Sequence, residues 1–304
     1  MPAPSTAPLF DAPVAIDDLT TARLLHPGAI KAAAARRVRP QRIVPESGRL
    51  LIVAADHPAR GALGAGARGA AMADRRELLR RLEAVLADPR VDGVLGTPDV
   101  LEDLLLMGAA DGKLLVGSMN RGGLQRAAFE IDDRYTAFTP ASLEALGCEA
   151  GKLLLRIDML DPATADALEN CAGAVTGLAE RDLIAMVEPF MSRRVDGHVA
   201  NELTAEAMVK AISISAGLGA TSSHTWLKVP WVDGIERALA ATTLPCLLLG
   251  GEVSDDPART YARWSAAFEQ PNMRGLVLGR SLLFPHDDDV PAALDAAAAI
   301  VAGA

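Results

Sequence analysis

Cysteine and histidine are scarce in this sequence. Its 304 residues include 3 cysteines and 5 histidines, and Cys148, Cys171 and Cys246 lie far apart. Metal sites built from these residue types have characteristic close spacings, which are missing here, so we expect no metal and no other cofactor. The odd number of cysteines, without a recognisable signal peptide, predicts reduced thiols in a cytoplasmic protein.

Positive charge is also in short supply. The chain has 30 Lys and Arg against 39 Asp and Glu, a formal net charge of −9, and its pI is about 5.1. Broad nucleic-acid and anionic-membrane surfaces require the opposite balance, so we expect neither partner. No apolar run reaches the ~20 residues that span a bilayer. A small local site for a phosphate remains compatible with this composition.

The chain is long enough for one α/β barrel or for two ordinary domains. Hydrophobic residues make up 50 % of it, which is enough for a large core. We expect residues 1–45 to form an N-terminal arm, irregular over 1–28 and with a short helix over 28–37 that covers the bottom of a barrel. Residues 46–304 are expected to form the barrel domain.

Short apolar runs alternate with helical segments from residue 49 onwards. The expected strands cover residues 50–55, 91–95, 113–117, 152–158, 183–189, 225–229, 244–249 and 273–278. This alternation predicts a parallel sheet with crossover helices, and about eight units over roughly 250 residues match a (β/α)8 barrel. An open doubly wound sheet is the alternative. It would place a glycine-rich dinucleotide turn directly after the first strand, whereas the first glycines come late in a loop.

A single amine lies within the apolar segment 225–231. Leu227 and Val229 flank Lys228, and Pro230 ends the strand. Lysine is seldom fully buried unless it is paired or has a task. Burial removes hydration and lowers the pKa of the amine, and a neutral amine can attack a carbonyl to form a Schiff base. The alternative is a lysine at a strand end whose ammonium reaches water, and this segment alone does not choose between them.

Acidic residues follow several of the other expected strands. Active-site residues of a barrel lie at the carboxyl ends of its strands, which here are marked by Asp56, Asp158, Glu188 and Lys228. An unpaired carboxylate at the end of an apolar strand is costly, which favours a function. The alternatives are that Asp56 caps the next helix and that Glu188 is a surface acid before Pro189.

Glycines end the last two expected strands. Gly250 and Gly251 follow the seventh strand, and Gly279 and Arg280 follow the eighth. The phosphate site of a barrel is commonly built from these two loops. Glycines expose backbone N–H groups to an anion, and arginine can hold a phosphate with two parallel hydrogen bonds. Each glycine alone indicates only a tight turn, but the combination favours a phosphate site.

The roles of four polar residues, Arg156, Asp158, His57 and His224, are not determined by the sequence. Lys152, Arg156 and Asp158 share one face of the fourth strand, because side chains alternate along a strand. If that face points inward, these three residues form a charged stack inside the barrel. Lys152 at the strand start is equally compatible with solvent exposure. His57 and His224 flank the first and sixth strands and are either ordinary loop residues or proton-transfer groups.

These segments together resemble a known family. The sequence is similar to the class I, Schiff-base aldolases of the deoxyribose-phosphate/fructose-bisphosphate aldolase superfamily, especially the branches acting on fructose 1,6-bisphosphate, tagatose 1,6-bisphosphate and sulfofructose phosphate. The matching pieces occur in the family order over residues 49–282, and each is short. They are Ala54-Ala55-Asp56, Lys152, Val187-Glu188-Pro189, Leu227-Lys228-Val229-Pro230, Gly250-Gly251 and Gly279-Arg280-Ser281-Leu282.

The resemblance implies a role for each matching residue. Lys228 would be the Schiff-base nucleophile, and Glu188 the general acid and base for carbinolamine formation and dehydration. Asp56 would take the proton from the substrate hydroxyl during cleavage. Lys152 would place a positive charge beside the reacting centre and help to keep Lys228 neutral. The phosphate of a sugar phosphate would be held by Gly250, Gly251, Gly279 and Arg280.

Some positions depart from the family pattern. Bisphosphate aldolases often carry serine before the glycines of the seventh strand, where this chain has Leu249, and the 56–60 loop is not the usual continuation of any one branch. The substrate is therefore open, and a phosphorylated keto-sugar acid is a further candidate. Two other functions also remain: a phosphosugar isomerase or lyase with a carboxylate base, and a non-catalytic sugar-phosphate-binding barrel. We expect a homo-oligomer, because most soluble oligomers are symmetric.

Overall fold

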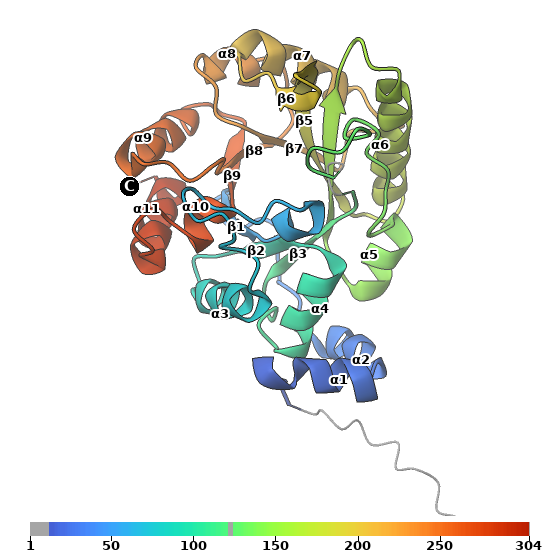
Figure 1. Ribbon diagram of the computed structural model, residues 1–304, viewed down its shortest axis with the longest axis vertical. Coiled ribbons are helices and arrows are strands. Elements are labelled where there is room, and N and C mark those ends of the chain that lie inside the picture. Colours follow the sequence, from blue (N-terminus) through green and yellow to red (C-terminus); the bar gives the residue numbers. More distant parts are fainter. Residues whose placement is uncertain (1–11, 121–123, 304) are drawn as a thin grey trace, which may run out of the picture.

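Eight parallel strands close into a barrel. The computed structural model describes residues 12–120 and 124–303, and hydrogen bonding follows the order β4-β3-β2-β1-β9-β8-β7-β5, with β4 and β5 also paired. Figure 1 shows the ring with helices around it. The predicted (β/α)8 barrel is therefore confirmed. The barrel strands are β1 (Leu50–Ala54), β2 (Gly93–Gly96), β3 (Leu114–Ser118), β4 (Ala150–Ile157), β5 (Ile184–Val195), β7 (Thr225–Val229), β8 (Cys246–Leu249) and β9 (Met273–Leu278).

The strands are buried on both faces, which explains their unbroken apolar runs. Their inner faces fill the barrel with side chains such as Ile52, Met186 and Val277. Their outer faces pack against the surrounding helices in a second, larger core. Within the described residues, no helix is both long and apolar enough to cross a membrane. The helices are α3 (Arg75–Leu86), α4 (Pro98–Leu106), α5 (Pro140–Leu146), α6 (Ala163–Ala179), α7 (Ala205–Ala216), α8 (Ile235–Leu239), α9 (Pro257–Ala267), α10 (Arg280–Leu283) and α11 (Val290–Ala302).

The N-terminal arm differs from its prediction in two ways. The expected helix is present as α2 (Gly28–Arg36), but the stretch predicted to be irregular also contains η1 (Ile16–Asp18) and α1 (Leu19–Leu25). Both α helices lie outside the ring next to α4 and do not cover its bottom (Figure 1). Residues 1–11 of the predicted arm lie outside the described residues.

The bottom of the barrel is covered by the segment that follows α2. Ile43 packs against the side chains inside the barrel. Arg37 is buried and its Nη2 lies 2.5 Å from Glu149 Oε1, while Glu149 Oε2 accepts a hydrogen bond from Leu115 N at 2.9 Å. This charge-assisted contact anchors the segment beneath β3 and β4. A helical cover was wrong because a segment without regular secondary structure, with Ile43 packed against the barrel interior, closes this end.

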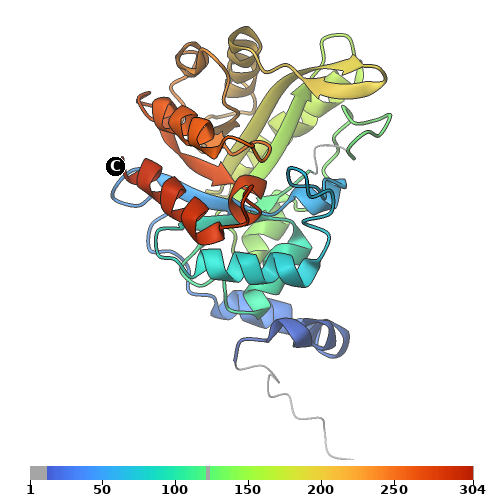
Figure 2. The same cartoon turned by 60° about the vertical axis from the view of Figure 1, so that its left-hand side comes forward.

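A hairpin extends one wall of the barrel beyond the sheet. β5 does not stop at Pro189 but continues to Val195, where β6 (His198–Asn201) returns antiparallel to it. Asp196 and Gly197, with φ of 50° and 79°, form the two-residue turn, as expected for an Asp-Gly hairpin. Figure 2 shows this hairpin projecting at the upper right of the molecule. It carries Asn201 to the rim of the central cavity.

Candidate active site

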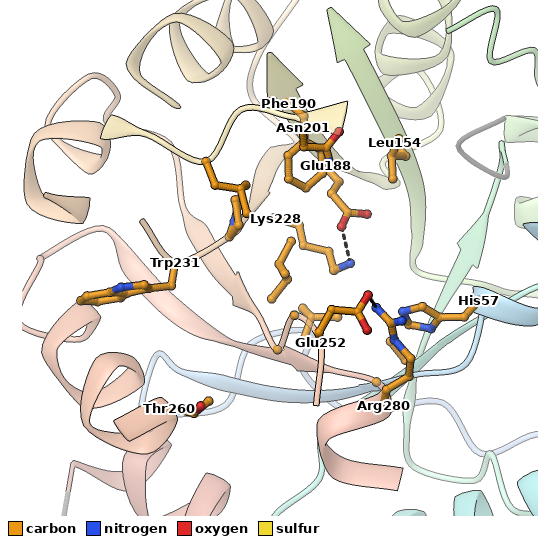
Figure 3. Close-up of a pocket in the computed structure, with 18 of the residues that line it drawn as sticks. His57, Leu154, Glu188, Phe190, Asn201, Lys228, Trp231, Glu252, Thr260 and Arg280 are labelled. Atoms are coloured by element: carbon orange, nitrogen blue, oxygen red, sulfur yellow. Dashed lines mark hydrogen bonds and ion pairs between the residues drawn. The ribbon is translucent and has the colours of Figure 1, made fainter. Parts of the chain in front are cut away.

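Lys228 and Glu188 face each other inside the barrel. Val187 pairs with Leu227 in the parallel ladder of β5 and β7, so the next residues along both strands are also neighbours. Lys228 Nζ donates to Glu188 Oε1 at 2.8 Å, and both side chains are buried. Figure 3 shows the pair pointing into a cavity, whose volume is about 360 Å³. The second explanation of Lys228, an amine that reaches water, is therefore wrong.

Lys152 and Asp56 extend this pair into a chain of four charges. Lys152 Nζ lies 2.7 Å from Glu188 Oε2 and 3.0 Å from Asp56 Oδ2. The order is Lys228, Glu188, Lys152, Asp56, so positive and negative groups alternate. The four residues come from different strands or strand ends. The side chains of Lys228, Glu188 and Lys152 are buried, and that of Asp56 is 10 % exposed. The structure thus brings together the four residues predicted to be catalytic.

Burial and neighbouring charge act differently on the two lysines. Burial lowers the pKa of Lys228, and the positive charge of Lys152 lowers it further, against the opposing effect of Glu188. Burial also disfavours the charged form of Lys152, but Asp56 and Glu188 outweigh it and raise its pKa. Lys152 therefore carries the fixed positive charge, and Lys228 is the amine that loses its proton more easily.

Both carboxylates are ionised in this arrangement. Burial favours the neutral acid in each, but Lys152 and Lys228 outweigh burial and lower the pKa of Glu188 to about 2. Lys152 is the largest of the influences that hold the pKa of Asp56 well below its usual range, with His57 and Lys228 acting in the same direction against burial. Asp56 and Glu188 can thus act as proton acceptors at neutral pH.

The predicted phosphate-binding residues line the same cavity, on the β8 and β9 side. A Cβ atom at Gly250 would collide with the hydroxyl of Ser281, and one at Gly279 would lie 2.6 Å from Cε1 of His57. Glycine is therefore required at both positions for close approach. Gly251 has a φ of 72°, a left-handed conformation that favours glycine.

Three buried polar atoms beside these glycines make no hydrogen bond with the described residues. They are Nε of Arg280, Oγ of Ser281 and Nδ1 of His57. His57 Nδ1 lies 3.7 Å from Asp56 Oδ1, beyond hydrogen-bond distance. Burial lowers the pKa of His57 to about 3, and the nearby cations Arg60, Arg280 and Lys228 contribute. A neutral imidazole, a hydroxyl and a guanidinium are all able to donate to one anion.

Arg280 has an unexpected partner. Its Nη2 lies 2.6 Å from Glu252 Oε1, on the loop between β8 and α9, and Figure 3 shows the carboxylate facing the guanidinium. The side chain of Arg280 is 10 % exposed, whereas that of Glu252 is 73 % exposed. Glu252 was missed in the sequence although it directly follows Gly250 and Gly251, because nothing in the pattern indicates where a loop side chain points.

The predicted charged stack on β4 is only partly correct. Arg156 points inward, and its Nη1 lies 3.2 Å from Glu130 Oε1. Asp158 does not join it, because it lies beyond the end of β4 and its Oδ1 accepts from Leu160 N at 3.0 Å within a turn. Asn201 was missed: its Oδ1 lies 3.4 Å from Arg156 Nε. The Asp-Gly turn of its hairpin was the available signal.

The two histidines lie at opposite ends of the barrel. His57 lines the cavity. His224 precedes the first residue of β7, and its Nδ1 is 2.9 Å from the Ser223 hydroxyl. That is the amino-terminal end of the strand, away from the loops that build a barrel's active site. His224 is therefore not part of the candidate site, whereas His57 is.

A family model described as Cgl0159-like matches residues 48–298. The crystal structure of Cgl0159 from Corynebacterium glutamicum is 47 % identical, with a TM-score of 0.91, and the match covers 94 % of this chain and 96 % of that chain. The chain belongs to the Cgl0159-like family. No curated protein matches this sequence significantly.

More distant structures share the barrel of this Cgl0159-like protein. An archaeal fructose 1,6-bisphosphate aldolase is 19 % identical, with a TM-score of 0.65 over 90 % of this chain and 100 % of that chain. A fructose-bisphosphate aldolase from Slackia heliotrinireducens is 14 % identical, with a TM-score of 0.63 over 96 % of this chain and 93 % of that chain. At these identities the likeness establishes a common fold, and the expected aldolase branch stays a prediction.

Proposed function

We propose that this protein is a class I aldolase that cleaves or forms a carbon–carbon bond of a phosphorylated ketose or keto-acid sugar. The observation that carries the proposal is the buried amine of Lys228, 2.8 Å from Glu188, with Lys152 fixed on the other side of that carboxylate. A neutral amine beside a proton acceptor and a fixed positive charge is the arrangement required for Schiff-base formation.

The first step joins the substrate to the enzyme. The neutral amine of Lys228 attacks the ketone carbon to form a carbinolamine, and the nitrogen loses a proton. Glu188, ionised and within hydrogen-bond distance, accepts that proton. It returns this proton to the alkoxide oxygen to complete the carbinolamine. A second proton, taken up from water through Glu188, then converts the hydroxyl into the water that leaves, which gives the iminium. Before the reaction, the positive charge of Lys152 favours the ionised form of Glu188 and the neutral form of Lys228.

The second step breaks the carbon–carbon bond. Asp56 takes the proton from the hydroxyl two carbons away from the iminium carbon. The bond between the intervening carbon and the hydroxyl-bearing carbon breaks, its electron pair moves to the iminium, and an aldehyde and an enamine result. Protonation of the enamine and addition of water release the ketone fragment and Lys228. A phosphate held at Gly250, Gly279 and Arg280 would orient the substrate.

Borohydride trapping tests this proposal. The protein is incubated with dihydroxyacetone phosphate and a small panel of ketose phosphates, reduced, and digested for peptide mass spectrometry. We expect an adduct on Lys228 and none on Lys31, Lys113, Lys152 or Lys210. Lys210→Arg, on the surface of α7, is the matched control for Lys228→Arg. No adduct with ligands that still bind would contradict the proposal.

A second function is favoured by one observation, the ion pair between Lys228 and Glu188 itself. In a phosphosugar isomerase with a carboxylate base, Lys228 would act only as a charge that holds Glu188 in place. Lys228→Arg separates the two functions, because arginine keeps the charge but forms no Schiff base under these conditions. Retained turnover in Lys228→Arg would favour the isomerase.

A further inference from the structure

Glu252 lies at the predicted phosphate site and carries a charge of the wrong sign for it. Its carboxylate is 2.6 Å from Arg280, and among the described residues it makes no other side-chain hydrogen bond or ion pair. Arg280 is the strongest anion-binding group at the two glycine loops, since guanidinium holds oxyanions with several parallel N–H groups. An anion that uses Arg280 must therefore share it with Glu252 or displace it.

The two partners are held very differently. Arg280 begins α10 directly after β9 and is 10 % exposed, so its guanidinium has little freedom. Glu252 is 73 % exposed and follows Gly251, whose φ of 72° turns the β8–α9 loop. The carboxylate can move into water at small cost, whereas the buried guanidinium cannot follow it. The pair therefore opens by movement of Glu252, and the site behind it stays in place.

Three polar atoms at and around Arg280 are available to bind a second anion. Its Nε, the Ser281 hydroxyl and Nδ1 of His57 are buried without a hydrogen-bond partner among the described residues. Glu252 contacts Nη2 and leaves all three unsatisfied. Buried donors without partners are costly, so an oxyanion larger than one carboxylate oxygen would gain contacts that Glu252 does not make.

We propose that Glu252 is a resident counter-ion of the anion site, which competes with the phosphate of the substrate for Arg280 and so weakens phosphate binding. The inference rests on the phosphate-binding part of the proposed function, but not on the Schiff base. Glu252 pairs with Arg280 in the free enzyme, and its carboxylate moves into water when the phosphate binds. It is thus a residue that sets substrate affinity without contacting the reacting carbons.

The expected size of the effect follows from exposure. Pairs with one solvent-exposed partner contribute modestly, because water and salt screen them. Removing the competing charge with Glu252→Gln should therefore tighten phosphate binding by about two- to fivefold. The gain should shrink as ionic strength rises, because screening weakens the interaction that the substitution removes.

The experiment measures binding of inorganic phosphate by calorimetry to the full-length protein and its variants. The matched control is Glu206→Gln, which removes the same charge from an exposed 2.8 Å pair with Arg237 outside the cavity. We expect tighter binding in Glu252→Gln and unchanged binding in Glu206→Gln. Equal or weaker binding in Glu252→Gln, or an equal gain in Glu206→Gln, would overturn the inference, as would phosphate binding to neither the wild type nor Glu252→Gln.

Borohydride trapping with dihydroxyacetone phosphate separates this inference from the aldolase proposal. If Glu252→Gln binds phosphate more tightly but Lys228 is never modified, the counter-ion role stands and the aldolase proposal fails. If Lys228 is modified but Glu252→Gln does not change phosphate affinity, the aldolase proposal stands and the counter-ion role fails. Thermal unfolding of each variant checks that the fold is retained.

Discussion

Two ion-pair systems meet at the central cavity, which is lined by Glu188 and Lys228 of one and by Glu252 and Arg280 of the other, and they are built in different ways. Lys228, Glu188, Lys152 and Asp56 lie on strands and at a strand end, and none of their side chains is more than 10 % exposed. The pair formed by Arg280 and Glu252 joins a buried group to a mostly exposed one on a loop. Strand register determines the first system, so it changes little during a reaction cycle. The second can open when a ligand arrives.

The comparison separates chemistry from binding. Charges in the buried chain interact strongly because water does not screen them, and removal of one leaves another uncompensated. The loop pair is screened and contributes little to stability. We therefore expect substitutions among the four clustered charges to affect turnover and folding. Substitutions of Arg280 or Glu252 should affect mainly substrate affinity. Five predictions follow this difference from the largest expected effect to the smallest.

Lys228→Arg breaks the buried chain at the nucleophile. The substitution keeps a positive charge beside Glu188 but removes the amine that forms the Schiff base. We expect kcat to fall by roughly a thousandfold or more, as for the removal of other covalent nucleophiles. Steady-state kinetics with the substrate found by trapping measures this effect. A rate within tenfold of the wild type would contradict the covalent mechanism.

Glu188→Gln breaks the same chain in the middle. We expect kcat to fall by roughly 10²- to 10⁴-fold, because general acid–base catalysis is lost. Stability should also fall, by about 3–5 kcal/mol, because two buried ammonium groups lose their shared partner. Urea unfolding of the variant checks the second effect. A loss of activity with unchanged stability would mean that the lysines find another partner.

The pH dependence of stability offers a check on Glu188. Its pKa is about 2 in the folded protein against an ordinary value of 4.5. A carboxyl whose pKa is lowered by folding stabilises the protein above its unfolded pKa. This contribution is present above about pH 4.5 and is lost as the pH falls toward about 2. The loss over this range should be smaller in Glu188→Gln than in the wild type.

Arg280→Gln breaks the loop pair from its buried side. We expect KM for the phosphorylated substrate to rise by about tenfold or more, with a smaller change in kcat, because charge-assisted contacts to the phosphate are lost. Arg237→Gln, in the exposed pair on α8, is the matched control. If Arg280→Gln lowered kcat and left KM unchanged, Arg280 would belong with the reacting groups and not with binding.

Lys152→Met tests whether Lys152 lowers the pKa of Lys228. Lys152 lowers the pKa of Lys228, so its removal should raise that pKa. Only the neutral amine attacks a carbonyl, so adduct formation rises with pH through the pKa of Lys228. In Lys152→Met this rising limb should move to higher pH. The measurement is the pH dependence of the trapping rate, and a limb at unchanged or lower pH would show that Lys152 does not tune Lys228.

Much of the barrel and the four-residue centre could be predicted. The strand runs are buried on both faces, so apolar sequence alone marked them. Strand ends indicated Asp56, Glu188 and Lys228, whereas the role of Lys152 was implied only by the resemblance to class I aldolases. The hairpin and α1 were missed because their apolar residues are few or interrupted. Asp158 was placed on the inner face by extending β4 one residue too far, since a strand's end depends on the loop that follows it.

The sequence by itself determined where the barrel strands run and in which order they follow, because alternating runs of apolar residues specify the strands, although the ends of β4 and β5 were not determined in this way. It also determined that Lys228 would be flanked along its strand by the apolar residues Leu227 and Val229. Only the tertiary structure decided how the charges pair: Lys152 bridges Glu188 and Asp56, and Glu252 forms an ion pair with Arg280. The pairs join residues far apart in sequence, so their energy depends on distances and burial that exist only in the folded chain.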